Sequence, residues 1–476
     1  MKPLIFNELK KYIQEDVIRY DVPGHKGNYL DNEYVKYFGQ NIIKADVNSM
    51  QRLDNLNFST GIIKQSQLNI AKLHNALDAR FLVNGTTQGI QVMILASLKP
   101  GAKILVPTNI HKSVQSAIIL SGAIPIYVNV QINDEYLIST GLLLKDIHRA
   151  LQEHPDIQVA LLINPSYYGI ALEFKKIIQY LKKLKIITLV DEAHGGSFYF
   201  LKDYTSAMDA GADMSCISYH KTLGTLTQTS LLLYNSSLVS IEQLDKAYTL
   251  LNTTSPSYLF MANLEVTILD LFQNKFKNFE TLTNKLEIYK KKINQIKGIK
   301  VLNYQNFKID KLELEPHRLV IDVSKLNISG FKVYELLRDK YQIQVELGEF
   351  NIILCIISIF DNLNDLDILI NSLQQISKKY YIIKENKKNL IIKNSVQKNF
   401  QPLREIFYAP NEAINYQESK GRILSENIML YPPGIALMLP GEVITAEFIE
   451  YLNLVKQEDI IVYGVNNDKV LVIKEE

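Results

Sequence analysis

Short apolar segments alternate with helix-like stretches from about Arg80 to Leu233, and this alternation constrains the fold more than any other feature. The candidate strands are residues 80–83, 103–107, 124–128, 159–164, 186–191, 214–218 and 230–234. Several are apolar at successive positions, as in IITLVD at 186–191, which is typical of strands buried on both faces. The connecting stretches 89–98, 112–121 and 175–184 have helical periodicity. The alternation predicts an α/β fold with a predominantly parallel sheet.

After Ser240 the pattern changes to longer helices, at 242–251 and 261–296, and then to strands near 301–302, 318–322 and 352–359. A Lys- and Asn-rich stretch at 378–401 indicates a boundary. Beyond it lie the turn signals YPPG at 431–434 and LPGE at 439–442. We therefore predict a large domain over 1–295, a smaller α/β domain over 296–385 and a C-terminal domain over 396–476.

Composition and charge exclude several classes of protein. The chain has 476 residues, 47% of them hydrophobic, and its 52 Lys and Arg nearly balance its 50 Asp and Glu. Without a basic surplus, nucleic-acid binding is not expected. The two cysteines, Cys216 and Cys355, lie far apart in apolar segments, so neither a disulfide framework nor a metal site is expected. The charged N-terminus lacks a signal peptide's apolar core, and the apolar stretch 352–360 is too short to span a membrane, which predicts a soluble cytoplasmic protein.

One motif that could bind a ligand follows the first candidate strand and precedes a helix-like stretch. It is Asn84-Gly85-Thr86-Thr87-Gln88-Gly89. A strand, a glycine turn and a helix N-terminus place free N–H groups and the helix dipole at one point, which suits a phosphate. Gly85 allows close approach of the backbone, and the two threonines offer hydroxyl donors. A plain capping role for Thr87 is an equally good interpretation of this motif alone.

Two more motifs follow strands. Asp191 ends an apolar strand and begins Asp-Glu-Ala-His, where its carboxylate suits either a protonated ring nitrogen or a simple turn cap. Lys221 follows the strand-like MSCIS. Keeping a lysine neutral at pH 7 costs about 4–5 kcal/mol, and burial or nearby cations lower that cost and yield an amine that forms Schiff bases. We expect an uncharged Lys221 amine buried at the rim of the sheet. Alone, a solvent-directed lysine is the commoner case.

Together the three motifs supply a phosphate cradle, an acid for a ring nitrogen and a Schiff-base lysine, which is what a pyridoxal 5'-phosphate (PLP) site needs. The chain also resembles the bacterial ornithine/lysine/arginine decarboxylases, PLP enzymes with the aspartate-aminotransferase-like fold. The matching segments are PGHKG (23–27), FLVNGTTQG (81–89), NIHKS (109–113), NPSYYG (164–169), LVDEAHG (189–195), SYHKTLGTLTQTS (218–230), TTSPSYLFMANLE (253–265) and GRILSENIMLYPPG (421–434). The motif PGHKG begins about twenty residues in, so the chain resembles the short form of the family, without an N-terminal wing domain.

The resemblance implies roles for individual residues. Lys221 would hold PLP as a Schiff base, and Asp191 would pair with its pyridinium nitrogen. His111 would stack on the cofactor ring, and His194 would lie near it. Gly85, Thr86, Thr87, Ser218 and His220 would surround the phosphate. Ser255 would reach the phosphate from the partner subunit, because this family builds its sites at a homodimer interface.

The implied activity is decarboxylation of lysine, arginine or ornithine to cadaverine, agmatine or putrescine, a step of polyamine biosynthesis. A fold-related PLP aminotransferase or lyase and a non-catalytic paralogue are the alternatives. Tyr219 and Gly224 depart from the family pattern, which more often has a small hydroxyl residue and a proline there, and this leaves the choice of substrate in doubt. Glu346 is a candidate receptor for the basic end of the substrate, although a solvated glutamate is the more common role.

Overall fold

A computed structural model describes residues 1–28, 32–136, 138–273, 277–307, 312–382, 402–430, 436–458 and 460–475. The chain divides into two compact units. Unit 1 comprises Met1–Ser97 and Ile187–Phe279, and unit 2 comprises Leu98–Ile186 and Glu280–Glu476. Each unit is therefore assembled from segments that lie far apart in the sequence.

Unit 1 contains four strands of α/β architecture. They are β1 (Asp78–Leu82), β8 (Ile187–Asp191), β9 (Met214–Ile217) and β10 (Ser230–Tyr234), in the order β1-β10-β9-β8. The β8–β9 pair is parallel, and β10 is antiparallel to both of its neighbours. Every residue of β1, β9 and β10 is buried, and for β9 and β10 this explains why polar and apolar residues do not alternate along the strand.

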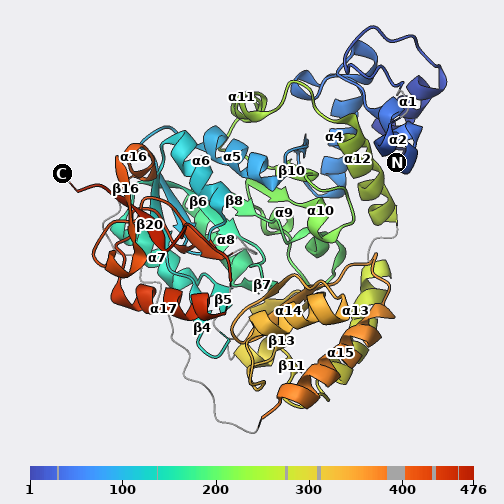
Figure 1. The fold of residues 1–476 in the computed structure, drawn as a ribbon. Coiled ribbons are helices and arrows are strands. Elements are labelled where there is room, and N and C mark those ends of the chain that lie inside the picture. Colours follow the sequence, from blue (N-terminus) through green and yellow to red (C-terminus); the bar gives the residue numbers. More distant parts are fainter. Residues whose placement is uncertain are drawn as a thin grey trace. The chain divides into compact units, whose positions relative to one another are not determined.

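Unit 1 also contains nine helices and three 3-10 turns within its described residues. They are α1 (Leu4–Gln14), α2 (Glu33–Phe38), α3 (Gln40–Ala45), α4 (Ile62–Leu73), α5 (Gly85–Ser97), α9 (Ala207–Ala210), α10 (Tyr219–Thr222), α11 (Ile241–Leu251) and α12 (Tyr258–Gln273), with the 3-10 turns η1 (Gln51–Leu53), η2 (Leu56–Phe58) and η3 (Gly196–Phe200). Helix α12 lies beside α1 and α4 (Figure 1). Its Glu265 accepts from the N–H groups of Leu4, at 2.8 Å, and Phe6, at 3.1 Å, which fixes the start of α1.

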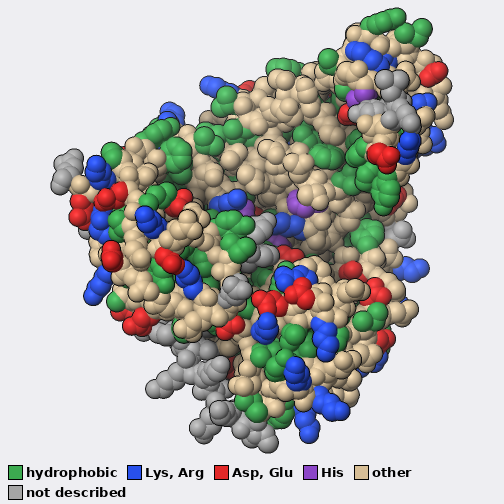
Figure 2. Space-filling view, viewed as in Figure 1, with side chains coloured by type: hydrophobic (Ala, Val, Ile, Leu, Met, Phe, Trp, Pro, Cys, Tyr) green, Lys and Arg blue, Asp and Glu red, His purple; other side chains and the backbone are tan. Residues whose placement is uncertain are grey.

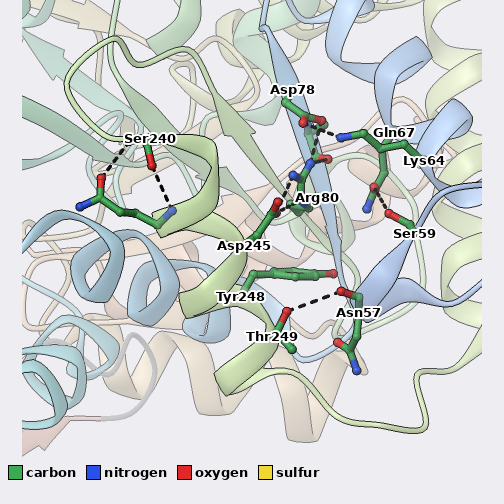
Figure 3. A network of polar contacts seen from close by, with 12 residues as sticks. Asn57, Ser59, Lys64, Gln67, Asp78, Arg80, Ser240, Asp245, Tyr248 and Thr249 are labelled. Atoms are coloured by element: carbon green, nitrogen blue, oxygen red, sulfur yellow. Dashed lines mark hydrogen bonds and ion pairs between the residues drawn. The ribbon is translucent and has the colours of Figure 1, made fainter.

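Ion pairs hold the edge strand β1 between α4 and α11 (Figure 3). Arg80 contacts Asp78 and Asp245, each at 2.7 Å, and Lys64 contacts Asp78 at 2.7 Å. Arg80 and Lys64 also line a cavity of about 720 Å³ beside Tyr248 and Thr249. Because carboxylates already neutralise both cations, this network stabilises the packing of α11 against β1.

In unit 2, three strands of the central sheet are parallel to one another. They are β2 (Lys103–Pro107), β3 (Ile124–Val128) and β6 (Ile157–Ile163), in the order β6-β2-β3, and their helices are α6 (Lys112–Ser121), α7 (Leu144–Glu153) and α8 (Phe174–Lys183). Two small pairs accompany them: β4 (Gln131–Asn133) with β5 (Ile138–Gly141), and β7 (Ile170–Leu172) with β12 (Leu312–Leu314).

A second sheet in unit 2 has the order β11-β13-β15-β14 and is antiparallel throughout. Its elements are β11 (Lys300–Val301), β13 (Arg318–Asp322), β14 (Leu347–Gly348), β15 (Ile352–Ile356), the turn η4 (Tyr304–Phe307) and the helices α13 (Lys277–Ile293), α14 (Gly330–Tyr341) and α15 (Asp365–Tyr380). Leu286, Leu337 and Leu373 of the three helices share one buried core with the sheet. On the outside of these helices, charges of both signs are interspersed (Figure 2).

The C-terminal part of unit 2 has its own apolar core, which includes Phe448 and Leu452. Its elements are α16 (Leu403–Tyr408), β16 (Asn411–Asn415), η5 (Tyr416–Glu418), β17 (Ile428–Leu430), β18 (Ala436–Met438), α17 (Ala446–Gln457), β19 (Val462–Tyr463) and β20 (Lys469–Ile473). Strand β16 pairs with β20, and the other three strands follow the order β18-β17-β19.

The predicted strands and helices are confirmed to within a few residues. The helix predicted at 261–296 coincides with α12 and α13, and residues 274–276 between them lie outside the described part of the chain. The predicted turn YPPG at 431–434 and most of the predicted boundary at 378–401 also lie outside it. The three domain ranges stay a prediction. Among the described residues, no helix has the length and apolarity to cross a membrane.

Candidate active site

Lys221 lies on α10, a single helical turn directly after β9. Its Nζ is 3.0 Å from Nε2 of His194, which is on the segment that follows β8. His194 is 8% exposed, whereas Lys221 is exposed. The expectation that Lys221 is buried is therefore wrong for the chain without ligand. The Lys221 side chain is exposed, and its amine contacts the enclosed imidazole of His194.

Asp191 is the last residue of β8, whose parallel neighbour β9 leads to Lys221. Its carboxylate is buried, and the Ala193 N–H donates to Oδ1 at 3.1 Å. Burial raises the pKa of the Asp191 carboxyl above its usual value, against the opposing effects of the Lys221 charge and the Ala193 N–H. A buried carboxylate of this kind is stabilised by a cationic ring nitrogen.

The predicted phosphate cradle forms the start of α5. Gly85 has a φ of +72°, so a glycine suits the turn, and space is open where its side chain would begin. The Thr86 hydroxyl bonds to the hydroxyls of Ser218 and, at 3.1 Å, Ser230, while Thr87 is exposed. The cradle helix and the lysine turn are thus joined directly. The Gly85 N–H donates to the Gln228 carbonyl, so the donors for a phosphate come from later in the turn.

His220 lies half-buried beside Lys221. Its Nδ1 is 2.8 Å from the Thr229 carbonyl, which fixes the hydrogen on that nitrogen in the neutral ring. Burial lowers the pKa of His220, the bond to Thr229 opposes that shift, and the Lys221 charge adds to it.

Three groups therefore lie together in unit 1: the Lys221 amine, the buried Asp191 carboxylate and the hydroxyl-lined N-terminus of α5. This donor set fits PLP.

Comparison with known proteins identifies the family. A model of the Orn/Lys/Arg decarboxylase major domain matches residues 3–365, and a model of the C-terminal domain of the same enzymes matches residues 389–468. The chain belongs to the Orn/Lys/Arg decarboxylase family. It is accordingly a PLP-dependent decarboxylase of basic amino acids, as the sequence predicts.

Two relatives cover nearly the whole decarboxylase. An arginine decarboxylase of Bacillus subtilis (strain 168) is 36% identical over 94% of this chain and 92% of its own length. An arginine decarboxylase of Halalkalibacterium halodurans is 34% identical over 98% of this chain and 95% of its own length.

Solved structures show the fold. A lysine decarboxylase of Francisella novicida has a TM-score of 0.89 at 21% identity, over 99% of this chain and 81% of that one. An alanine–glyoxylate aminotransferase of Nostoc has a TM-score of 0.52 at 15% identity, over 66% of this chain and 85% of that one. The predicted aminotransferase-like α/β fold is confirmed.

Not every predicted site residue of the decarboxylase lies in unit 1. Ser255 is exposed on the loop after α11, where its N–H donates to Thr253 Oγ1 at 3.1 Å. His111 belongs to unit 2, where it caps α6, its Nδ1 accepting from the Ser113 N–H at 3.2 Å. Glu346, also in unit 2, accepts from the Tyr167 hydroxyl. The roles of these residues stay predictions.

Several polar residues behind the lysine turn were missed by the sequence analysis. Tyr219 is fully buried and its hydroxyl bonds to the buried His74 at the end of α4. Glu192, next to Asp191, accepts from Tyr199 at 3.0 Å and from the Ala207 N–H at 2.6 Å. The departure of Tyr219 from the family pattern was the one signal in the sequence, whereas nothing in the segment around His74 points to a partner 145 residues away.

Proposed function

We propose that this decarboxylase releases CO2 from arginine and forms agmatine, with Lys221 as the residue that binds PLP and Asp191 as the partner of its ring nitrogen. One observation carries the proposal. The Lys221 amine and the buried Asp191 carboxylate follow neighbouring parallel strands, beside the helix N-terminus that suits the phosphate.

Each group of unit 1 has a distinct task in this proposal. PLP supplies the electron sink for loss of the carboxylate. Asp191 keeps the ring nitrogen protonated, and its burial strengthens that interaction. His194, 3.0 Å from Lys221, accepts a hydrogen bond from the amine and fixes its direction. Thr86, held by Ser218, positions the start of α5 for the phosphate.

Arginine is proposed as the substrate because two relatives that are more than 30% identical over nearly the whole chain are arginine decarboxylases. The lysine decarboxylase of known structure is only 21% identical, which supports the shared fold. A guanidinium and an ammonium differ in shape and in the number of hydrogen bonds they donate, so the two substrates require different receptors.

The test uses the purified chain with added PLP and arginine, lysine or ornithine in separate reactions, with CO2, amine and keto acid measured in each. We expect CO2 and agmatine in equal amounts from arginine, with kcat/KM at least about tenfold above that for the other two substrates. Lys221→Ala is expected to abolish product formation. Faster turnover of lysine or ornithine would contradict the choice of substrate. Keto acid without CO2 would contradict decarboxylation, and undiminished activity of Lys221→Ala would contradict the role of that lysine.

We also propose that two copies of the chain share their active sites, with Ser255 of one copy serving the cofactor of the other. The exposure of Ser255 supports this arrangement, because an exposed hydroxyl on a polar loop is available to a partner.

A further inference from the structure

We propose that Tyr219 and His74 act as a positioning pair that anchors the Lys221 turn from behind and so sets the direction of the Lys221 amine. The inference rests on the proposed role of Lys221 and adds to it a residue pair that never touches the substrate. It concerns how the reactive amine is held.

The geometry of α10 places the two side chains on opposite sides. Tyr219 and Lys221 are two positions apart on a single helical turn, so their side chains diverge by about 200° around its axis. Tyr219 is 0% exposed, whereas Lys221 is exposed. The turn is therefore fixed to the core on its Tyr219 side and carries the Lys221 side chain on the other.

His74 offers a rigid acceptor for the Tyr219 hydroxyl. It caps α4, and its Nδ1 is 2.8 Å from the Ile70 carbonyl. Because a carbonyl only accepts, Nδ1 carries the hydrogen of the neutral ring, and Nε2 is left to accept from Tyr219. Burial and the charge of Glu192 hold the pKa of Tyr219 well above its usual value, which keeps the hydroxyl protonated as the donor.

Aromatic rings enclose the imidazole. The ring centroids of Tyr199 and Phe272 are each 4.9 Å from that of His74, edge to face. The Tyr199 hydroxyl in turn donates to Glu192, the neighbour of Asp191. The segments that carry Asp191 and Lys221 are thus tied to the same buried cluster, so a shift of His74 changes the geometry of both.

Tyr219→Phe tests the pair because it removes the hydroxyl and keeps the ring. Three quantities are measured: the pH midpoint of the visible absorbance band of PLP on Lys221, the rate of borohydride trapping on Lys221, and kcat. We expect the midpoint to move by roughly one pH unit and kcat to fall about tenfold or more, since a small misplacement of a reacting group is costly. The apparent affinity for arginine should change much less, because the pair does not touch the substrate.

A second set of variants changes His74, the acceptor of the pair. His74→Leu should reproduce the effects of Tyr219→Phe, whereas His74→Gln retains an acceptor and should recover part of the wild-type midpoint. The double variant Tyr219→Phe/His74→Leu should be no worse than either single variant, because both remove the same hydrogen bond. If Tyr219→Phe does not fold, the comparison of His74→Leu with His74→Gln decides the question alone.

Tyr248→Phe is the matched control. Its hydroxyl is also buried and donates to the Phe81 carbonyl at 2.6 Å, on α11 and away from α10. This variant is expected to lower the melting temperature without moving the midpoint. A Tyr219→Phe protein with a lowered melting temperature and a wild-type midpoint, trapping rate and kcat would overturn the inference and leave Tyr219 a purely structural residue. A wild-type chain that lacks the band altogether would instead contradict the proposed function.

Discussion

Two adjacent carboxyl groups at the end of β8 have different surroundings and so different chemistry. Asp191 faces the charge of Lys221, whereas Glu192 accepts from Tyr199 and from a backbone N–H inside the core. Burial raises the pKa of Glu192 to about 8. The two residues are neighbours in the sequence, yet only Asp191 belongs to the proposed site. The surroundings of each carboxyl group therefore determine its role.

Asp191→Asn should impair turnover more than folding. An amide keeps the size of the carboxyl group but loses its charge, and a hydrogen bond to a charged group is worth about 1.5–3 kcal/mol, which corresponds to roughly 10- to 150-fold in kcat. Steady-state kinetics with arginine measure the loss. Asp213→Asn is the control, because Asp213 is also buried but accepts from Thr188 and Ser236, outside the proposed site. Equal losses in the two variants would argue against a special role for Asp191.

Glu192→Gln should change how stability depends on pH. Because the pKa of Glu192 rises from 4.5 to about 8 on folding, the folded chain binds more protons than the unfolded chain between those values. The contribution of Glu192 to stability therefore decreases as pH rises through this window, by up to about 1.4 kcal/mol per pH unit. Glutamine does not titrate, so melting temperatures of the variant should fall less than those of the wild type between pH 5.5 and 8. Parallel curves would contradict the assignment.

At the scale of elements, the cradle helix α5 packs unusually closely on the sheet. A Cβ atom at Gly89 would lie 2.3 Å from Cys216 Sγ and 2.6 Å from Leu82 Cδ1. Only a glycine allows this approach, and it brings the N-terminus of α5 next to Ser218 at the end of β9. The proposed phosphate site therefore depends on a contact one helical turn away from it.

Gly89→Ala should displace α5 from β9. We expect a destabilisation of about 1–3 kcal/mol, as for other overpacked cores, together with weaker PLP binding. The melting temperature and the PLP dissociation constant measure the two effects. Adding Cys216→Ala removes the atom with the worst clash and should recover part of both losses. If PLP affinity stays at the wild-type value while stability falls, the helix has not moved and the proposed coupling fails.

At the scale of the whole molecule, a chain of amide side chains connects the cradle to the loop that bears Ser255. Gln88 on α5 donates to Asn252 at 3.1 Å, Asn252 donates to Asn57 at 2.7 Å, and Asn57 donates to the Thr253 carbonyl at 3.0 Å. The loop is thus ordered from within its own chain while Ser255 itself is exposed. This arrangement supports the proposal that Ser255 serves a second copy.

Mixing two impaired variants tests that proposal. Equal amounts of Lys221→Ala and Ser255→Ala chains are unfolded, combined and refolded, and the activity is compared with that of each variant alone. In a shared-site dimer, each mixed pair has one site with both Lys221 and Ser255 intact, so about a quarter of all sites should regain wild-type turnover. If Ser255 serves its own chain, mixing restores no intact site and the activity equals the average of the two variants.

Much of the fold could be predicted from the sequence because it depends on local patterns. Residues 103–107 and 230–234 coincide with β2 and β10, since a strand that is buried on both faces has an uninterrupted apolar segment. Asp191, Lys221 and the Gly85 turn were identifiable because each lies at the end of a strand or within a few residues of one.

The sequence by itself determined the alternation of strands and helices and the types of residue that follow each strand, because these depend on burial and on neighbours along the chain. Only the tertiary structure decided that Tyr219 meets His74, that Lys221 lies 3.0 Å from His194, and that Gly89 packs on Cys216. Each of these contacts joins segments that are distant in the sequence. Their geometry depends on how helices and strands pack, which a local pattern does not contain.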